Sequence, residues 1–211
     1  MQIFHYELGP IGVNCFLILP ENSGAVLIDA PEGSFDAVKD ALKAQNKDLA
    51  AVLLTHGHWD HIWDAKKIRD YFFNSKIYAH PDGRKFIEEQ GAQSAYMFGE
   101  SNLESVKIDC PLFDGQFLQF GDCKIKALHT PGHCAGSMSF IIEEKKLAFV
   151  GDLLFAQSVG RTDLPTGSFA DLEKSVRNKI YTLPDDFEIL PGHGEFTTVA
   201  AERRSNPYVG E

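Results

Sequence analysis

Three histidines and one aspartate gather in residues 56–61, a stretch of sequence His-Gly-His-Trp-Asp-His that directly follows a short apolar run. The apolar run predicts a strand that ends in a loop at this point. Side chains two residues apart in extended backbone face the same way, so His56 and His58 can converge on one point. Asp60 and His61 come where the next helix is expected to begin, and they aim at a second point nearby. Imidazole nitrogens and a carboxylate oxygen at this spacing suit Zn²⁺ or another first-row divalent cation, so the stretch predicts a metal site.

Two further histidines and an aspartate follow later strands of the predicted pattern in the same way. They are His133 in residues 129–133 (His-Thr-Pro-Gly-His), Asp152 in a Gly-Asp pair, and His193 in a Pro-Gly-His-Gly turn. Loops at one end of a rigid scaffold are where binding groups collect. Glycine and proline allow the backbone to turn sharply and fix the direction of the side chain between them. Each cluster is weak alone, but the four together in this order predict one shared site.

The elements that must position these side chains follow from the hydrophobic pattern. Strands are expected at 3–8, 13–19, 25–29, 49–55, 76–79, 116–120, 123–128, 137–142, 147–150 and 187–190. Helices are expected behind Ser34 as N-cap, after residue 61 with one apolar face formed by residues 62, 65, 68 and 72, around 86–87, over 172–180 and over 199–204. No linker separates the halves, so the pattern predicts one α/β (α+β) domain over residues 1–211, with two sheets face to face and helices outside.

Composition limits the classes of partner and compartment. The formal net charge of the 211-residue chain is −10, which argues against binding to a nucleic-acid backbone because that requires a basic face. No apolar run approaches the ~20 residues of a membrane span, and the first residues do not have the pattern of a signal peptide. The four cysteines are scattered without a Cys-x-x-Cys pair, as expected of reduced thiols. A cytoplasmic location is therefore expected, and a small anionic substrate remains compatible with the charge because a metal pair makes its own local field.

Together, these motifs resemble the full ligand set of the metallo-β-lactamase superfamily, and the resemblance extends over nearly the whole chain. The resemblance implies a four-layer αββα sandwich with two divalent cations at one edge. Zinc is the expected metal, with iron or manganese as alternatives. In this pattern one cation is held by three histidines, the second by a mixed set, and one aspartate bridges them: His56, His58 and His133; Asp60, His61 and His193; and Asp152. His129 is not a ligand in the pattern and is expected to pack or to support a neighbour.

The resemblance also implies the chemistry of the site. Two close cations lower the pKa of a shared water toward ~7, so that a bridging hydroxide becomes available as a nucleophile at neutral pH. Asp60 is expected to be catalytic as well as a ligand, because it can hold or accept a proton of this hydroxide. The strand-end residue Asp29 is expected to accept hydrogen bonds in a turn or beside the site, with a catalytic role as the alternative.

The segment Gly-Arg-Thr-Asp-Leu-Pro at residues 160–165 is similar to the single-domain, type II glyoxalase-like hydrolases, as is the tail at 202–208. This similarity implies hydrolysis of small thioesters, with S-lactoylglutathione or a related hydroxyacylglutathione as substrate. Arg161 then corresponds to the basic residue that binds a carboxylate of the glutathione moiety, for which a planar guanidinium is well suited. The alternative is that Arg161 and Asp163 pair with each other. The larger type II glyoxalases carry a C-terminal helical glutathione-binding domain that this sequence lacks, which leaves the thiol carrier open.

Other activities share the same motifs. Persulfide dioxygenases resemble this pattern in their ligands and in a comparable Gly-Arg-Thr-Asp loop, but they use a single iron and O₂. A lactonase or β-lactamase is a second alternative, and a metal-binding protein without activity is a third. The sequence does not decide the native metal, the acyl group, the oligomeric state or the role of residues 91–109, where a lid, a substrate wall and a surface contact are all compatible with the pattern.

Overall fold

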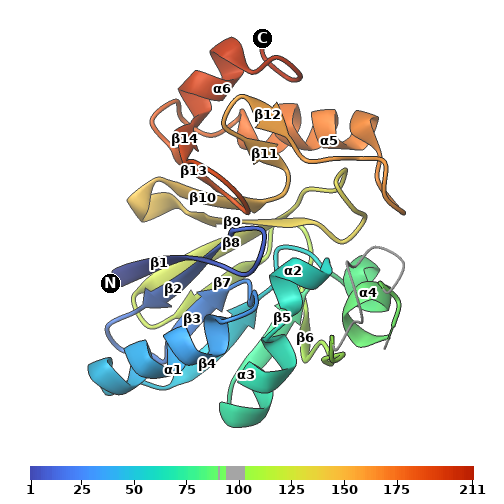
Figure 1. The fold of residues 1–211 in the computed structure, drawn as a ribbon. Helices are drawn as coiled ribbons and strands as arrows, with labels where there is room; N and C mark the ends of the chain where they lie inside the picture. The colour runs from blue at the N-terminus through green and yellow to red at the C-terminus, as the bar shows by residue number, and fades with distance from the viewer. Residues whose placement is uncertain (90, 94–102) are drawn as a thin grey trace.

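The computed structural model describes residues 1–89, 91–93 and 103–211, so the middle of the 91–109 segment lies outside the described residues. Two six-stranded sheets face each other, as Figure 1 shows. The first sheet has the order β1-β2-β3-β4-β5-β6 and contains β1 (Gln2–Leu8), β2 (Val13–Leu19), β3 (Ala25–Ile28), β4 (Leu49–Leu53), β5 (Lys76–Ala79) and β6 (Cys110–Pro111). Its first three strands are antiparallel, and β3 to β6 are parallel.

The second sheet has the order β14-β13-β10-β9-β8-β7. Its strands are β7 (Phe117–Phe120), β8 (Cys123–His129), β9 (Met138–Ile142), β10 (Leu147–Gly151), β13 (Glu188–Pro191) and β14 (Thr197–Thr198). Only β10 and β13 pair in parallel, and the other neighbours are antiparallel. A small hairpin of β11 (Leu154–Phe155) and β12 (Ser158–Val159) follows β10.

Helices cover the outer face of each sheet (Figure 1). Helices α1 (Ser34–Gln45) and α3 (Ala65–Tyr71) lie on the first sheet, and α5 (Phe169–Ser175), which continues into a π-helical turn (Val176–Ile180), lies on the second with α6 (Val199–Ser205). The short helices α2 (Trp59–Ile62) and α4 (Arg84–Glu88) lie at the edge where the histidine loops gather. Among the described residues, short 3₁₀ turns span Pro81–Gly83 and Glu143–Lys145.

The period of two in the strand sequences explains why four layers form. In β2, Cys15, Leu17 and Leu19 pack toward the α1/α3 side, whereas Phe16 and Ile18 pack toward the second sheet. Both faces of this strand are therefore apolar and buried. A third apolar cluster fills the space between the second sheet and α5/α6. Three cores between four layers confirm the αββα sandwich expected from the sequence.

Two details of the predicted helices were wrong, and Asp64 explains both. The helix expected after the histidine loop is divided into α2 and α3, and the break falls at Trp63 and Asp64. Asp64 is buried there and accepts hydrogen bonds from the backbone N–H groups of Gly33 and Phe35, at 2.9 and 3.0 Å. The N-cap of α1 is consequently Gly33, with φ of 89° and no side-chain cap of its own, rather than Ser34.

None of the helices in the described part of the chain has the length and apolar composition needed to cross a bilayer.

Candidate metal centre

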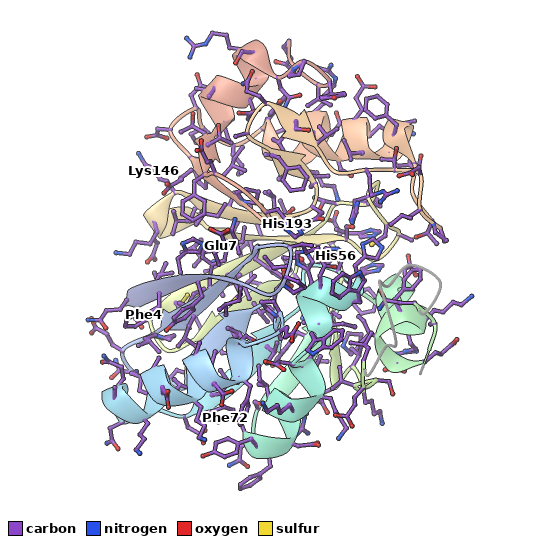
Figure 2. The ribbon with its side chains drawn as sticks, viewed as in Figure 1. Phe4, Glu7, His56, Phe72, Lys146 and His193 are labelled. Atoms are coloured by element: carbon purple, nitrogen blue, oxygen red, sulfur yellow. The ribbon has the colours of Figure 1, made fainter. Side chains whose placement is uncertain are left out.

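Four strand ends deliver the predicted side chains to one edge of the sandwich. The 56–61 loop follows β4 of the first sheet, whereas His133, Asp152 and His193 follow β8, β10 and β13 of the second sheet. Figure 2 shows His56 and His193 close together between the two halves, although they come from different sheets. The structure thus brings together all seven side chains that the sequence motifs single out.

His56, His58 and His133 form the first triad. One nitrogen of each ring lies within 4.8 Å of the others, and Nε2 of His133 lies 2.8 Å from Nδ1 of His58. The rings of His56 and His133 meet edge to face, with centroids 4.9 Å apart. Nε2 of His56 is buried and has no hydrogen-bond partner among the described residues. The first triad therefore aims nitrogen lone pairs at a common point that no protein donor fills.

Asp60, His61 and His193 form the second triad, whose candidate ligand atoms also lie within 4.8 Å of one another. Nε2 of His193 is 3.2 Å from Oδ2 of Asp60 and 3.3 Å from Nε2 of His61. The imidazole of His61 is fully buried, whereas 23% of the His193 side chain is exposed. The second triad is therefore the one that solvent reaches.

Asp152 stands between the triads. Its Oδ2 is 3.7 Å from Nε2 of His133 in the first triad and 3.7 Å from Nε2 of His193 in the second. Its Oδ1 is 3.3 Å from Nε2 of His61, and this buried oxygen has no hydrogen bond among the described residues. A carboxylate placed in this way suits the space between two cations ~3.5–4 Å apart.

Hydrogen bonds at the outer nitrogen fix which nitrogen turns inward in four of the five rings, those of His56, His61, His133 and His193. Carbonyl and carboxylate oxygens accept from Nδ1 of three rings, which makes Nδ1 the protonated nitrogen and leaves the Nε2 lone pair free. The acceptors are Asp29 Oδ2 for His61 at 2.8 Å, the Arg161 carbonyl for His133 at 2.7 Å, and the Ile11 and Gly12 carbonyls for His193 at 3.2 Å each.

Thr55 plays the same part for His56. Its hydroxyl donates to Oδ2 of Asp29 at 2.7 Å, so it can accept from Nδ1 of His56, which lies 3.0 Å away. Asp29 also accepts from the Thr55 N–H at 2.7 Å and adopts a left-handed φ of 57°. The prediction that Asp29 accepts hydrogen bonds beside the site is confirmed, and Asp29 supports a ring in each triad. Thr55 was missed because a hydroxyl beside a histidine carries no sequence signal of its own.

The histidines of the two triads differ in the direction in which their pKa values are shifted. Burial, together with the neighbouring histidines, holds the pKa of His56 well below its ordinary value and lowers the pKa of His58 to about 4. Burial also lowers the pKa of His61, but Asp60, Asp152 and Asp29 outweigh it and raise the pKa well above the ordinary value. The pKa of His193 is raised as well, because the hydrogen bond to Asp60 and the charge of Asp152 outweigh burial.

The carboxylates are held ionised by the same contacts. Burial opposes ionisation of Asp152, but the histidines around it, His61 foremost, keep its pKa well below the ordinary value. Burial likewise opposes ionisation of Asp60, and His61 and His193 lower its pKa. Buried carboxylate oxygens beside converging imidazole nitrogens form the donor set that divalent first-row cations take, so the residues present fit a two-cation centre.

The comparison with known proteins agrees with this geometry. A family model described as the metallo-β-lactamase superfamily matches residues 8–193. The chain belongs to the metallo-β-lactamase superfamily. Its cluster of histidines and aspartates corresponds to the place where members of this superfamily hold a dinuclear metal centre, and the superfamily is one of hydrolases.

Three relatives cover almost the full chain. Hydroxyacylglutathione hydrolase GloC of Haemophilus influenzae is 36% identical over 197 residues, which are 93% of this chain and 92% of the relative. The crystal structure of BLEG-1, a B3 metallo-β-lactamase, superposes with a TM-score of 0.90 at 34% identity and covers 100% of both chains. The structure of TTHA1623 in a di-iron-bound form superposes with a TM-score of 0.83 at 31% identity, over 97% of this chain and 99% of that one.

Arg161 of this superfamily member is not free in the structure. Its guanidinium donates two hydrogen bonds of 2.7 Å to the carboxylate of Asp163, and both side chains are more than half exposed. The pairing that the sequence left open as an alternative is therefore present. The backbone carbonyl of Arg161, which no motif indicated, is the part that contacts the metal centre, through Nδ1 of His133.

A second group of histidines lies outside the triads and does not suit a cation. The rings of His80 and His129 stack face to face, with centroids 3.8 Å apart and 4° between their planes. An imidazole binds a cation in the plane of its ring, and one cation cannot lie in two stacked planes. Nδ1 of His80 already accepts the N–H of Asp82, and Nε2 of His129 donates to the carbonyl of Ala135. Both histidines are packing residues, as the sequence led us to expect for His129.

Proposed function

We propose that this member of the metallo-β-lactamase superfamily hydrolyses small thioesters, with S-lactoylglutathione or a related hydroxyacylglutathione as substrate. The observation that carries the metal-dependent part is the position of Asp152, at equal distances from a ring of each triad. The thioester part rests on the similarity to hydroxyacylglutathione hydrolase GloC, which extends over 93% of this chain.

Seven side chains would hold two divalent cations. The first triad offers three imidazole nitrogens, the second offers two imidazole nitrogens and a carboxylate, and Asp152 lies between them. We infer zinc because neutral imidazoles and carboxylates match its preferences; iron is the alternative, given that TTHA1623 is described in a di-iron-bound form. When bound, such a pair polarises a carbonyl oxygen and lowers the pKa of water at the site.

Asp60 is the proposed proton acceptor. Its Oδ2 lies at the open, second-triad side, 3.2 Å from Nε2 of His193, and its lowered pKa keeps it ionised at neutral pH. An ionised carboxylate can hold a water by one hydrogen bond and accept its proton as the water attacks the acyl carbon. A thiolate is a good leaving group, so the carbon–sulfur bond can break without a strong general acid to protonate the sulfur.

Arg161 is the proposed contact for a carboxylate of the substrate. Because Asp163 occupies only the Nε/Nη2 edge of the guanidinium, a substrate carboxylate would bind at the Nη1 side or displace Asp163. Exposed pairs of this kind contribute little to stability because solvent screens them, so exchange of partners costs little. The proposed partner is therefore a small anionic thioester.

A second candidate is β-lactam hydrolysis, which the 34% identity with BLEG-1 over the full chain favours. Attack of an activated water on the strained amide of a β-lactam needs the same cations. It does not use the proposed contact between Arg161 and a carboxylate of glutathione, because a β-lactam has no glutathione part. Persulfide oxidation differs from both because it requires one iron and consumes O₂.

The deciding experiment assays protein purified without added metal, whose metal content has been measured, on a panel of three substrates. S-Lactoylglutathione, glutathione persulfide and a chromogenic cephalosporin are the members. We expect two cations per chain and hydrolysis of the thioester, lost on chelation and restored by Zn²⁺. A single iron with persulfide-dependent oxygen uptake, or turnover of the cephalosporin alone, would make the proposal wrong.

A further inference from the structure

The turn that carries His193 is supported from the opposite end of the chain. Gly192 and Gly194 flank this histidine, so the turn has few side-chain contacts of its own. The β1–β2 hairpin provides the support: Val13 forms an isolated antiparallel bridge with His193, and the N–H of Asn14 donates to the Gly192 carbonyl at 2.7 Å. His193 of the second triad is thus held in place by residues of the β1–β2 hairpin, near the amino terminus.

The side chain of Asn14 is at the centre of this support. It is 2% exposed, and its Nδ2 donates to the carbonyls of Pro191 at 3.0 Å and Gly194 at 2.9 Å. These two carbonyls lie on either side of His193. Its Oδ1 accepts from Nε2 of His5 at 2.8 Å. The two carbonyl partners establish which end of the amide is the NH₂ group.

Only an asparagine meets all three requirements at this position. Aspartate has the same shape but cannot donate to the two carbonyls, serine has a single donor, and leucine has no polar atom. Pro191 is buried, so its carbonyl would have no alternative partner in the sandwich if the amide were removed. The turn would then keep its backbone contacts with the hairpin but lose the two hydrogen bonds that hold it on either side of His193.

We propose that Asn14 is a positioning residue for the second cation. By holding the backbone before and after His193, it keeps Nδ1 of the ring against the Ile11 and Gly12 carbonyls and turns Nε2 toward Asp60 and Asp152. The inference rests on the proposed use of the two triads as cation sites, and it adds a residue that lies outside every metal motif.

The effect is confined to one triad. No hydrogen bond of Asn14 reaches the first triad, whose outer nitrogens are held instead by Thr55 and by the Arg161 carbonyl. Loss of Asn14 should therefore affect the affinities for the two cations differently. The first is bound as before, and the second is bound more weakly. A residue that merely stabilised the fold would weaken both alike.

The test is a titration of the full chain, stripped of metal, with Zn²⁺ and in parallel with Co²⁺, whose absorbance reports each site. In Asn14→Ala we expect the first equivalent to bind as in the unchanged protein and the second to bind about 10–100-fold more weakly, the range seen when the hydrogen-bond support of a ligand is removed. Asn206→Ala is the matched control. Asn206 is also a buried amide, and it donates to the Ser158 carbonyl at 3.0 Å and to Glu202 at 2.8 Å, with no bond to either triad.

A milder variant keeps the test valid if Asn14→Ala does not fold. His5→Phe retains a ring that can stack on Phe16, where the His5 ring now lies at 5.1 Å, and removes only the bond to Oδ1 of Asn14. We expect a smaller weakening of the second equivalent alone.

Three results would overturn the inference: two equivalents bound with unchanged affinity in both variants, equal weakening of both equivalents, or an unchanged protein that binds a single ion. The titration contains no thioester. An unchanged protein that binds two ions without hydrolysing S-lactoylglutathione would therefore refute the proposed substrate and leave the role of Asn14 standing.

Discussion

The two triads occupy the same edge of the sandwich but differ in charge and access. The first consists of three histidines, two of them with lowered pKa, and His56 and His133 are almost fully buried. The second contains Asp60 and opens to solvent at His193. The first would hold a cation by imidazole nitrogens alone, and the second by two imidazole nitrogens and a carboxylate. The two triads thus offer one site of nitrogen ligands and one site of mixed ligands that is partly exposed at His193.

Asp152 is the residue on which this comparison depends most, because it faces both triads. Asp152→Asn keeps the size of the side chain but removes the charge that separates the two cations. We expect kcat/KM for the thioester to fall about 10³-fold or more, since a cation contributes several kcal/mol of charge stabilisation, and we expect the second cation to be lost. Metal content and steady-state kinetics measure both effects. Retention of two cations with undiminished turnover would show that the triads do not need a shared carboxylate.

Gly192 and Gly194, which flank His193, differ in the space around them. A Cβ at Gly192 would lie 2.2 Å from Oδ1 of Asp152 and 2.7 Å from Cε1 of His61, whereas a Cβ at Gly194 would meet nothing within 4 Å. Gly192→Ala should displace both neighbours and cost about 3 kcal/mol of unfolding free energy, as overpacking does. Gly194→Ala, at φ +72°, should cost about 1 kcal/mol of backbone strain. Thermal unfolding and metal content of both variants provide the measurement, and equal losses would contradict the assignment of Gly192 to the centre.

Thr55→Val tests the first triad in the way that Asn14→Ala tests the second. The substitution keeps the shape but removes the acceptor of the His56 N–H, so the affinity for the first cation should fall about 10–100-fold. Thr130→Val is the control, because the Thr130 hydroxyl is also fully buried and bonds only to Ser139 at 2.9 Å. Competition with a chelator of known affinity reports the change. A greater weakening of the second cation would reverse the comparison.

The backbone carbonyl of Arg161 contacts the metal centre, whereas its guanidinium is exposed. Substitution of this side chain should therefore have the smallest effect of these variants. Arg161→Gln leaves the backbone carbonyl that accepts from His133 and removes only the exposed guanidinium. For a glutathione thioester we expect KM to rise about tenfold with kcat unchanged, the loss of one exposed charged contact worth about 1.4 kcal/mol. The matched variant Asp163→Asn frees the guanidinium and should not raise KM. A fall in kcat for Arg161→Gln would place the side chain in the chemistry instead.

Much of this arrangement could be predicted from short-range pattern alone. The period of two that turns His56 and His58 the same way is a property of extended backbone, and the order of strands and helices predicts two facing sheets with helices outside. Glycine and proline beside His133 and His193 marked the strand ends at which those side chains now lie.

Apart from Thr55, which is adjacent to His56 in the sequence, the errors and omissions have a common cause, which is contact between distant segments. Asp64 ends one helix because it bonds to Gly33 and Phe35 on another, so no local signal predicted the break. Asn14 and Pro191 are 177 residues apart, and neither belongs to a metal motif. The pairing of Arg161 with Asp163 is local and was foreseen as an alternative, but the use of the Arg161 carbonyl depends on where His133 happens to lie.

The hydrogen bonds from Asn14 to the Pro191 turn also bear on how the centre is assembled. All three members of the first triad precede His193 in the sequence and are synthesised before it. Asn14 is also synthesised early, and its hydrogen-bond partners in the Pro191 turn form only when the last strands of the second sheet have been made. Closure of the second triad thus depends on segments from both ends of the chain, because His193 lies in the turn after β13 and its support lies in the first hairpin. A chain that lacked either segment would retain the residues of the first triad and lose the support of the second.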